Sequence, residues 1–359
     1  MSTLSLSRID DTTYLDLAAG HGLPLEQLPA WDRYEDALPG HAPFGRFLWR
    51  DSTGQPRALI SLTRMEGRGF TYLWAKKGPV WLGERPTAGE ELEFRTTLAQ
   101  LVRSADRGLA FMRIHAWHRA ADLHELLQTV TYDRTVVVDV ARPDAQIRAS
   151  FSKSGRRQAR KAEAEGLEFC DETERAREVF PELYAILTET ASRDDFGAAP
   201  MSQYVTMLES LGPDHARLFV ARAEGRALAW QIVLATDDLG EAYYGATNAE
   251  ARQRHASMFM DMHTMTWLRE TGRKSYDLMG VHSERAPQLE GVTGYKQKFA
   301  ADFTEVAGAW DVPLRPRYYR ALTLALHAKR AAVRTVRAAR ERVGRRGGKA
   351  SAARVTARD

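Results

Sequence analysis

Five basic side chains recur at helical spacing near the middle of this 359-residue chain: Lys153, Arg156, Arg157, Arg160 and Lys161. This spacing places all five on one face of an α-helix. Like charges held that closely destabilise a helix, by roughly a few tenths of a kcal/mol for each pair four residues apart. Bound phosphate groups would offset that cost, so the stripe predicts a phosphate-binding surface. The alternative is a solvated face balanced by Glu163 and Glu165.

A second group with chemical potential lies at residues 294–299, where Lys296 and Lys298 alternate with Tyr295 and Phe299. A lysine in an aromatic-walled cleft can stabilise a developing oxyanion or bind a phosphate. Lysines between aromatic side chains also extend from ordinary cores into solvent, which is the simpler alternative.

Other catalytic patterns are missing from the sequence. His115 and His118 are too few for a metal site, and there is no HExxH, Walker A or GxSxG motif. Cys170, the single cysteine, has no histidine near it in sequence and is expected to be a buried structural thiol. We therefore expect no metal and no internal disulfide.

The elements that must position these residues repeat along the chain. Two stretches each read as three short strands, one helix and one strand. The first has strands expected at residues 45–50, 57–64, 70–75 and 109–115 and a helix at 89–105. The second has strands expected at 217–222, 226–235, 242–246 and 275–279 and a helix at 257–271. This order predicts two copies of one α+β unit.

The remaining segments complete the domain plan. Between the copies we expect a strand at 135–140 and helices at 152–166, 174–191 and 201–211. A closing strand at 303–306, an extended connector at 311–316 and a helix at 317–343 follow. The expected divisions are a first domain at 1–146, a second at 147–315, a C-terminal helix at 316–343 that packs on the first domain, and a flexible basic tail at 344–359.

The repeated unit has the order found in acetyltransferases, which hold the coenzyme A pyrophosphate in a glycine-rich loop at a helix N-terminus. The corresponding segment here, Arg252–Ser257, contains no glycine, and His255 adds bulk where bare backbone is needed. Coenzyme A is therefore not the expected donor, and no other cofactor is expected.

The charge distribution is uneven. Residues 320–359 carry twelve Lys and Arg against one Glu and one Asp, a charge of +10, which leaves −6 for the rest of a chain whose net charge is +4. A basic tail on an acidic body predicts a polyanionic partner, either RNA or an anionic membrane surface. A tail that only aids solubility is the alternative. The longest nearly apolar stretch, Ala227–Ala235, is about half the length of a membrane span, so a soluble cytoplasmic protein is expected.

Several segments together resemble the FemA/FemB/FemX-type aminoacyltransferases, which add amino acids from aminoacyl-tRNA to peptidoglycan precursors. Residues 139–166 resemble that family's strand followed by a K-x-x-R-x-x-I-R-K-A-x-x-x-G helix, and Tyr276–Val281 resembles its YDLGGI strand end. Residues 294–302 and 310–314 are similar to its F-K-K-G-F-G-G-E and F-D-L-P-L closing segments. Near the start, residues 28–31 and 77–80 resemble its QS-x-x-W and RGPV pieces.

The resemblance implies two tandem acetyltransferase-like (GNAT-like) domains with the C-terminal helix returning to the first domain. The coiled-coil arm of some members has no counterpart here. The implied reaction is attack by an amino group of a peptidoglycan precursor, lipid-linked or nucleotide-linked, on the ester carbonyl of a charged tRNA. Such a protein would work in the cytoplasm, with the tail placing it at the inner membrane face.

The resemblance also implies roles for individual residues. Lys296 matches the functional lysine of the closing segment, and the stripe on residues 153–161 would bind tRNA phosphates. Substrate-binding positions fall on seven residues: Arg33, Trp31, Lys77, Arg193, Tyr204, Tyr244 and Lys298. Glu35 stands where the family has a basic residue, so Arg33 is the substitute, and Arg193 is the nearest arginine before Tyr204.

Two alternatives from the sequence remain. The same donor could serve amide-bond formation on a small peptide metabolite. Or the chain could be a non-catalytic module that binds RNA or a membrane through its tail.

Overall fold

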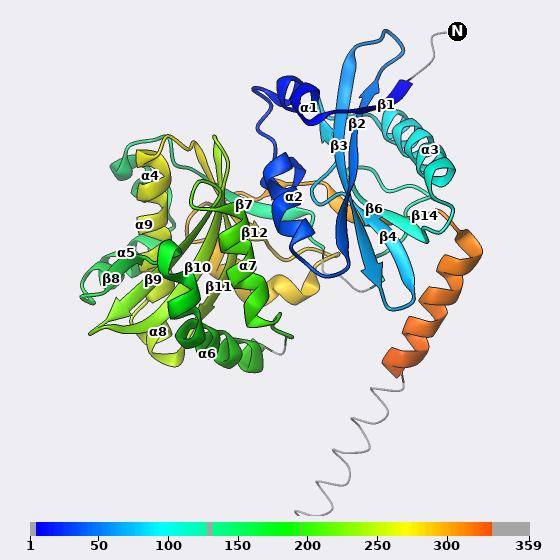
Figure 1. Ribbon diagram of the computed structural model, residues 1–359. Helices are drawn as coiled ribbons and strands as arrows, with labels where there is room; N and C mark the ends of the chain where they lie inside the picture. The colour runs from blue at the N-terminus through cyan, green and yellow to red at the C-terminus, as the bar shows by residue number, and fades with distance from the viewer. Residues whose placement is uncertain (1–4, 128–130, 195, 332–359) are drawn as a thin grey trace, which may run out of the picture.

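The computed structural model describes residues 5–127, 131–194 and 196–331, and its strands form two sheets in separate halves of the molecule (Figure 1). The first sheet runs in the order β1 (Ser5–Ile9), β2 (His41–Arg50), β3 (Pro56–Gly67), β4 (Phe70–Trp74), β6 (Phe111–Ala116) and β14 (Gly308–Pro313), with β5 (Val80–Trp81) beside β3. The second runs β13 (Thr304–Glu305), β7 (Arg134–Asp139), β12 (Ser275–Gly280), β11 (Leu239–Thr247), β10 (Arg226–Ala235), β9 (Ala216–Ala223) and β8 (Glu168–Asp171).

Helices cover both sheets. Those of the first half are α1 (Asp11–Ala18), the short 3-10 turn η1 (Leu25–Gln27), α2 (Pro29–Asp36) and α3 (Ala88–Ala105). Those of the second half are α4 (Asp144–Ser150), α5 (Lys153–Glu163), η2 (Thr173–Arg175), α6 (Ala176–Asp194), α7 (Met201–Leu211), α8 (Ala249–Gln253), α9 (Ala256–Glu270), η3 (Pro287–Leu289) and α10 (Glu290–Lys296). Local sequence explains where several begin: Thr87 and Glu90 form a capping box before α3, and Ser152 caps α5.

The expected repeat is confirmed by this arrangement. In each half an antiparallel meander leads to a helix and then to a strand that pairs in parallel with the last meander strand: β4 with β6, and β11 with β12. The helix between each parallel pair, α3 or α9, makes the crossover connection that parallel strands require. The chain is therefore an α+β protein of two tandem units.

The two halves exchange strands, which differs from the expected domain ranges. β7 lies within residues 1–146 but pairs with β12 of the second sheet, whereas β14 lies within 147–315 but pairs with β6 of the first. β14 also replaces the expected connector at 311–316. The pairing of β14 with β6 explains this difference. It leaves Asp311 fully buried, where its carboxylate accepts a hydrogen bond from Arg113 of β6 at 2.7 Å.

Residues 316–331 form a helix that lies against the first half, as the orange ribbon of Figure 1 shows. Tyr319 packs in a cluster with Ala110, Phe111 and Leu127, and its hydroxyl lies 3.1 Å from Oδ2 of Asp311. The expected return of the C-terminal helix to the first domain is confirmed. The rest of the expected helix and the tail at 344–359 lie outside the described residues.

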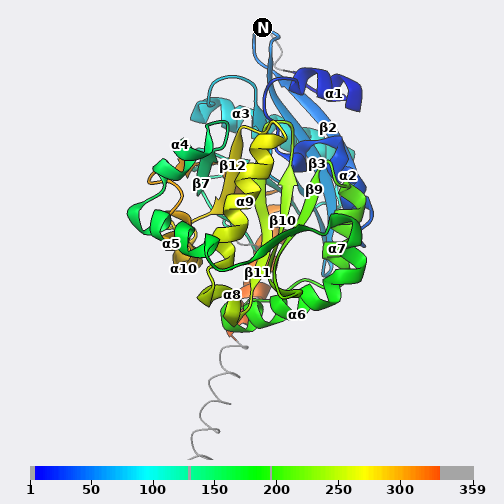
Figure 2. The same ribbon diagram turned by 90° about the vertical axis from the view of Figure 1, so that its left-hand side faces the viewer.

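Both faces of the second sheet are buried. One face packs on α5 and α9, and α9 lies across it in Figure 2. The other packs on α6 and α7, and this core also takes Leu25, Trp31 and Tyr34 from the first half. Because α2 packs on α7, the two halves share a hydrophobic core.

Candidate active site

The second sheet splits open at one point. β11 and β12 pair only over three residues, and the last pair joins Glu241 to Asp277. Beyond it β11 continues to Thr247 while β12 turns away toward β7. Ligands of α/β sheets bind at such openings beyond the carboxyl ends of parallel strands. The chemistry-bearing residues described below gather around this opening.

Lys296 ends α10 beside the last residues of β12. Its ammonium donates to the carbonyl oxygens of Gly280 at 2.7 Å and Met279 at 3.2 Å. An ammonium has three N–H donors, so one remains without a partner among the described residues. Burial lowers the pKa of Lys296 to about 8, although Asp277 and Asp261 act in the opposite direction. The side chain can therefore offer a directed positive charge to an oxyanion.

A buried hydrogen-bond network positions α10. The hydroxyl of Tyr295 donates to Oδ2 of Asp261 on α9 at 2.5 Å, and the hydroxyl of Tyr276 donates to Oδ1 at 2.9 Å. Burial raises the pKa of Asp261 to about 6. The sequence analysis missed Asp261, although an acidic residue between two methionines in the middle of a helix was a detectable signal.

A cavity of about 450 Å³ lies between the two halves at the same opening. Lys77, His115 and Trp117 line it from the first half, and Tyr132, Glu241 and Asp277 from the second. Lys77, which lines the cavity, and Met279, which contacts the lining residue Tyr132, have φ angles of +54° and +67°, a strained conformation for side-chain-bearing residues that is concentrated at functional sites. The sequence analysis did not single out Glu241 or Asp277.

Lys77 is held between two carboxylates. Its ammonium lies 3.1 Å from Oε1 of Glu26 and also bonds Oε1 of Glu241. Burial, reinforced by Glu26 and Asp277, raises the pKa of Glu241 to about 7, against the opposing effect of Lys77. Because two carboxylates neutralise Lys77, its charge is not available to a substrate phosphate in this structure.

The position at which the QS-x-x-W motif predicts a basic residue holds a buried carboxylate. Glu35 accepts from Nε1 of Trp31 at 2.6 Å and from Nζ of Lys76 at 2.7 Å, and lies 2.5 Å from Nδ1 of His41. Burial acts to raise its pKa, but Lys76 and His41 outweigh it and lower the pKa to about 2. Arg33 lies on the exposed side of α2.

An aromatic cluster connects three of the other expected substrate-binding residues. The ring of Tyr244 lies 5.0 Å from that of Tyr204 and 4.9 Å from that of Tyr243, and Tyr243 lies 6.0 Å from Trp31. Arg193 is near the end of the same strand, since it donates to the carbonyl of Thr247 at 3.1 Å, but its charge is paired with neighbouring Asp194.

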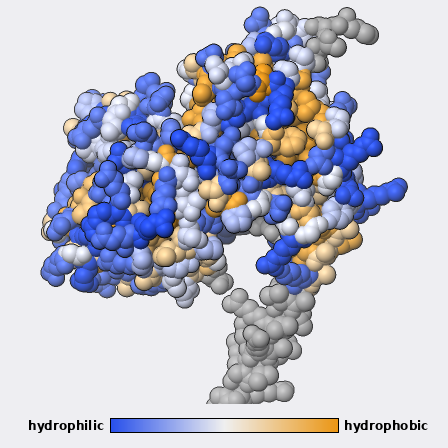
Figure 3. Space-filling view, in the orientation of Figure 1, coloured by the Kyte–Doolittle hydropathy of each residue, from blue (hydrophilic) through white to orange (hydrophobic). Residues whose placement is uncertain are grey.

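The basic stripe lies on the exposed face of α5, opposite the buried residues Gly155, Ala159 and Ala162. Among the described residues no carboxylate forms an ion pair with any of the five cations. The glutamates that could have balanced them are occupied elsewhere: Glu163 pairs with Arg148 at 2.5 Å and Glu165 with Arg254 at 3.3 Å. Hydrophilic side chains also cover much of the second half in Figure 3.

Lys298 connects this stripe to the closing segment. Its Nζ donates to Oε1 of Gln158 on α5 at 2.6 Å, and Gln158 lies 3.1 Å from Nδ1 of His255. His255 precedes α9 with φ +55° and makes no capping hydrogen bond through its side chain. The side chains of His255 and Gln158 therefore lie next to the N-terminus of α9, and His255 does not cap it.

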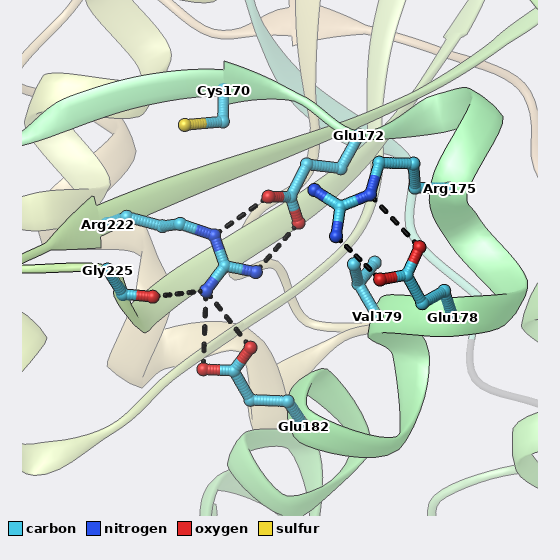
Figure 4. Close-up of a pocket in the computed structure, with 8 residues that line it drawn as sticks. All are labelled: Cys170, Glu172, Arg175, Glu178, Val179, Glu182, Arg222 and Gly225. Atoms are coloured by element: carbon cyan, nitrogen blue, oxygen red, sulfur yellow. Dashed lines mark hydrogen bonds and ion pairs between the residues drawn. The ribbon is translucent and has the colours of Figure 1, made fainter.

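A second pocket, of about 500 Å³, lies at the outer edge of the second sheet and contains Cys170 (Figure 4). Arg222 pairs there with Glu172 and Glu182, and Arg175 pairs with Glu178. Burial raises the pKa of the Cys170 thiol. The arginines are neutralised and the thiol is not activated, so this pocket is not a candidate for catalysis.

The described residues contain no group of three or more His, Cys, Asp or Glu that could hold a metal ion. No helix among them is long and apolar enough to cross a membrane.

Comparisons with known proteins agree with this architecture. A family model described as an acetyltransferase (GNAT) domain matches residues 149–297. FemX matches with a TM-score of 0.69 and 15% identity over 89% of this chain and 100% of its own. The C-terminal domain (DUF2156) of a putative lysylphosphatidylglycerol synthetase from Agrobacterium fabrum has a TM-score of 0.51 and 16% identity over 89% and 96%. L-PGS from Bacillus licheniformis has a TM-score of 0.50 and 13% identity over 89% and 98%. No curated protein matches the chain in sequence.

Fold and site together define a protein of two tandem GNAT-like units with a cavity between them. The particular arrangement is similar to that of FemX, so the chain has a FemABX-type fold.

Proposed function

We propose that this protein is an aminoacyltransferase that moves an amino acid from aminoacyl-tRNA to an amino group of a peptidoglycan precursor. The observation that carries the proposal is the placement of Lys296, with one unpartnered N–H, at the opening between β11 and β12 of a FemX-type fold. Acyl transfer passes through a tetrahedral intermediate with a negatively charged oxygen, and a preorganised cation stabilises such a centre.

The donor is a charged tRNA. An aminoacyl ester is already activated, so alignment and charge stabilisation suffice for transfer. The helix α5, which carries the stripe on its exposed face, packs against the closing segment through its other face, where a Cβ on Gly155 would come within 2.4 Å of the Lys298 carbonyl oxygen. Phosphates bound along α5 would therefore lie on a helix that contacts the closing segment, which holds Lys296. The basic tail would add to this electrostatic attraction or bind anionic lipid.

A reconstituted reaction tests the proposal. Enzyme, a mixed pool of charged tRNA and candidate acceptors are incubated, and mass spectrometry identifies the acceptor that gains an amino acid. We expect transfer that RNase abolishes and acetyl-CoA does not support. Modification of a small peptide instead of a wall precursor would identify the other acceptor class. RNase-resistant acetyl transfer, or binding of RNA or vesicles without any transfer, would contradict the proposal.

Variants connect the reaction to the site. Lys296→Met keeps the apolar stem and removes the charge, so the rate should fall by about 10²–10³. Replacing Arg157 and Arg160 by alanine should raise the apparent KM for charged tRNA and make its binding less dependent on salt. Arg175→Ala and Arg177→Ala, whose partners are surface glutamates, serve as the matched control.

A further inference from the structure

The cavity between the two halves has an unusual balance of charge at its inner end. Glu26 and Glu241 both pair with the ammonium of Lys77, and a third carboxylate, Asp277, lies close enough to Glu241 to raise its pKa. The cation at the outer end, Arg85, pairs with Glu305 at 3.3 Å. Lys296 also acts on Asp277, so these three carboxylates face two ammonium groups and the inner end carries an excess of one negative charge.

Two of these carboxylates present unused oxygens. Glu241 is only 3% exposed, lines the cavity, and uses Oε1 for Lys77, while no described residue bonds its Oε2. Asp277 also lines the cavity, and its Oδ1 accepts from the Met279 N–H at 2.6 Å and from Thr135, which leaves Oδ2 without a partner among the described residues. Nearby, Oε2 of buried Glu26 has no partner either. Glu241 and Asp277 line the cavity, so their free oxygens are available to a ligand that supplies donors, whereas the Glu26 oxygen is enclosed by protein and contributes its negative charge alone.

The walls define the rest of that ligand. Pro24, Pro79, Val80 and Val306 line the cavity together with Trp81 and Trp117. Such walls fit a methylene chain, and aromatic faces also attract an alkylammonium. A carboxylate or phosphate group would instead meet the excess negative charge.

We infer that this cavity binds the acceptor through a primary alkylammonium group, and that the Glu241 carboxylate removes a proton from that nitrogen. The inference rests on the proposed function for the reaction, but the binding part stands without it. Asp277 holds the ammonium in place and is a positioning residue. The cavity also borders the site of Lys296, because Tyr132 lines it and its hydroxyl contacts the sulfur of Met279 at 3.7 Å.

The transfer step balances with these groups. Glu241 takes one proton from the ammonium, which frees the nitrogen lone pair to form a bond to the ester carbonyl carbon. The bond from that carbon to the ribose oxygen of the tRNA then breaks, and the second nitrogen proton goes to that oxygen. Glu241 returns its proton to solvent, and the products are an amide and a free tRNA hydroxyl.

The proton transfer is tested by the pH dependence of kcat. The titratable groups that interact with Glu241 are Lys77, Glu26, Asp277, Tyr132 and Tyr243. In the wild type kcat should rise with pH as Glu241 loses its proton. Glu241→Gln should lower kcat by about 10²–10⁴ and remove that rise, whereas Glu241→Asp should keep it. The matched control is Glu172→Gln, which loses an equally buried ion pair, with Arg222, outside the cavity.

Binding is tested separately by titrating the protein with n-butylammonium or butyrate and measuring its tryptophan fluorescence. The Trp117→Phe variant assigns the fluorescence signal. We expect n-butylammonium to bind, Glu241→Gln and Asp277→Asn to raise its Kd at least tenfold, and butyrate not to bind. Equal binding of both probes, or unchanged kcat and pH dependence in Glu241→Gln, would overturn the inference. If Lys296→Met abolishes transfer and Glu241→Gln does not, only this inference fails. If no aminoacyl transfer occurs at all, the proposed function fails. The binding experiment still tests whether the cavity binds an alkylammonium group.

Discussion

Tyr295 donates a 2.5 Å hydrogen bond to Asp261 and thereby ties the residue before Lys296 to the core of the second unit. Tyr295→Phe should lower the free energy of unfolding by about 1.5–3 kcal/mol, the range for hydrogen bonds to charged groups. Urea denaturation measures the loss.

The same variant should show a defined pH dependence. Asp261 has a pKa of about 6 in the folded protein, above its ordinary 3.8, so its charged form is disfavoured by folding and this group stabilises the fold less as pH rises through 6. The Tyr295 hydroxyl partly relieves that penalty. The difference between wild type and Tyr295→Phe should therefore be larger at pH 8 than at pH 5. An equal difference at both pH values would mean that Asp261 is not ionised in the network.

Gly155 allows α5 to approach the closing segment. A Cβ there would lie 2.4 Å from the Lys298 carbonyl oxygen, a backbone atom that cannot move aside by itself. Gly155→Ala should destabilise the protein by about 1–3 kcal/mol and raise the KM for charged tRNA as α5 shifts. Gly291→Ala is the control, since nothing lies within 4 Å of its added Cβ on α10 and it should be neutral or slightly stabilising. Thermal unfolding that is identical in both variants would contradict this role.

Transfer activity should depend on pH with two limbs. Glu241, with a pKa of about 7, must be deprotonated, so activity rises through that pH. Lys296, with a pKa of about 8, must be charged, so activity falls above it. The expected profile of kcat is a bell with a maximum between these values, which belong to the interacting site as a whole. Lys296→Met should leave its residual activity without the alkaline limb. A flat profile from pH 6 to 9 would contradict both assignments.

Glu35 should behave as a structural carboxylate. Its pKa of about 2 lies below its ordinary 4.5, so its ion pairs stabilise the fold fully above pH 4.5 and lose that effect as pH falls through 2. Glu35→Gln should cost about 3 kcal/mol near neutral pH, because Lys76 keeps its charge without a partner. Asp36→Asn, an exposed neighbour on α2, should change stability by less than about 0.5 kcal/mol. The Glu35 deficit, measured by chemical denaturation, should shrink toward pH 2; a constant deficit would contradict the ionic explanation.

The amino-acid sequence by itself determined the features that repeat over short distances. Helical spacing predicted the cationic face of α5, and strand and turn patterns predicted both copies of the α+β unit, because these signals need only neighbouring residues. The resemblance of the closing segment also pointed to Lys296 before its surroundings were known.

Tertiary structure alone decided which charges meet. Lys77 and Glu241 are 164 residues apart, and their ion pair exists only because the two halves close around one cavity. The exchange of β7 and β14 between the sheets has the same origin, since strand pairing joins segments from opposite ends of the chain. Lys77 was expected to contact substrate, but its ammonium is paired with two carboxylates. Local sequence patterns do not predict such ion pairs, because the energy of a buried charge depends on its partners and on the exclusion of solvent, and folding supplies both.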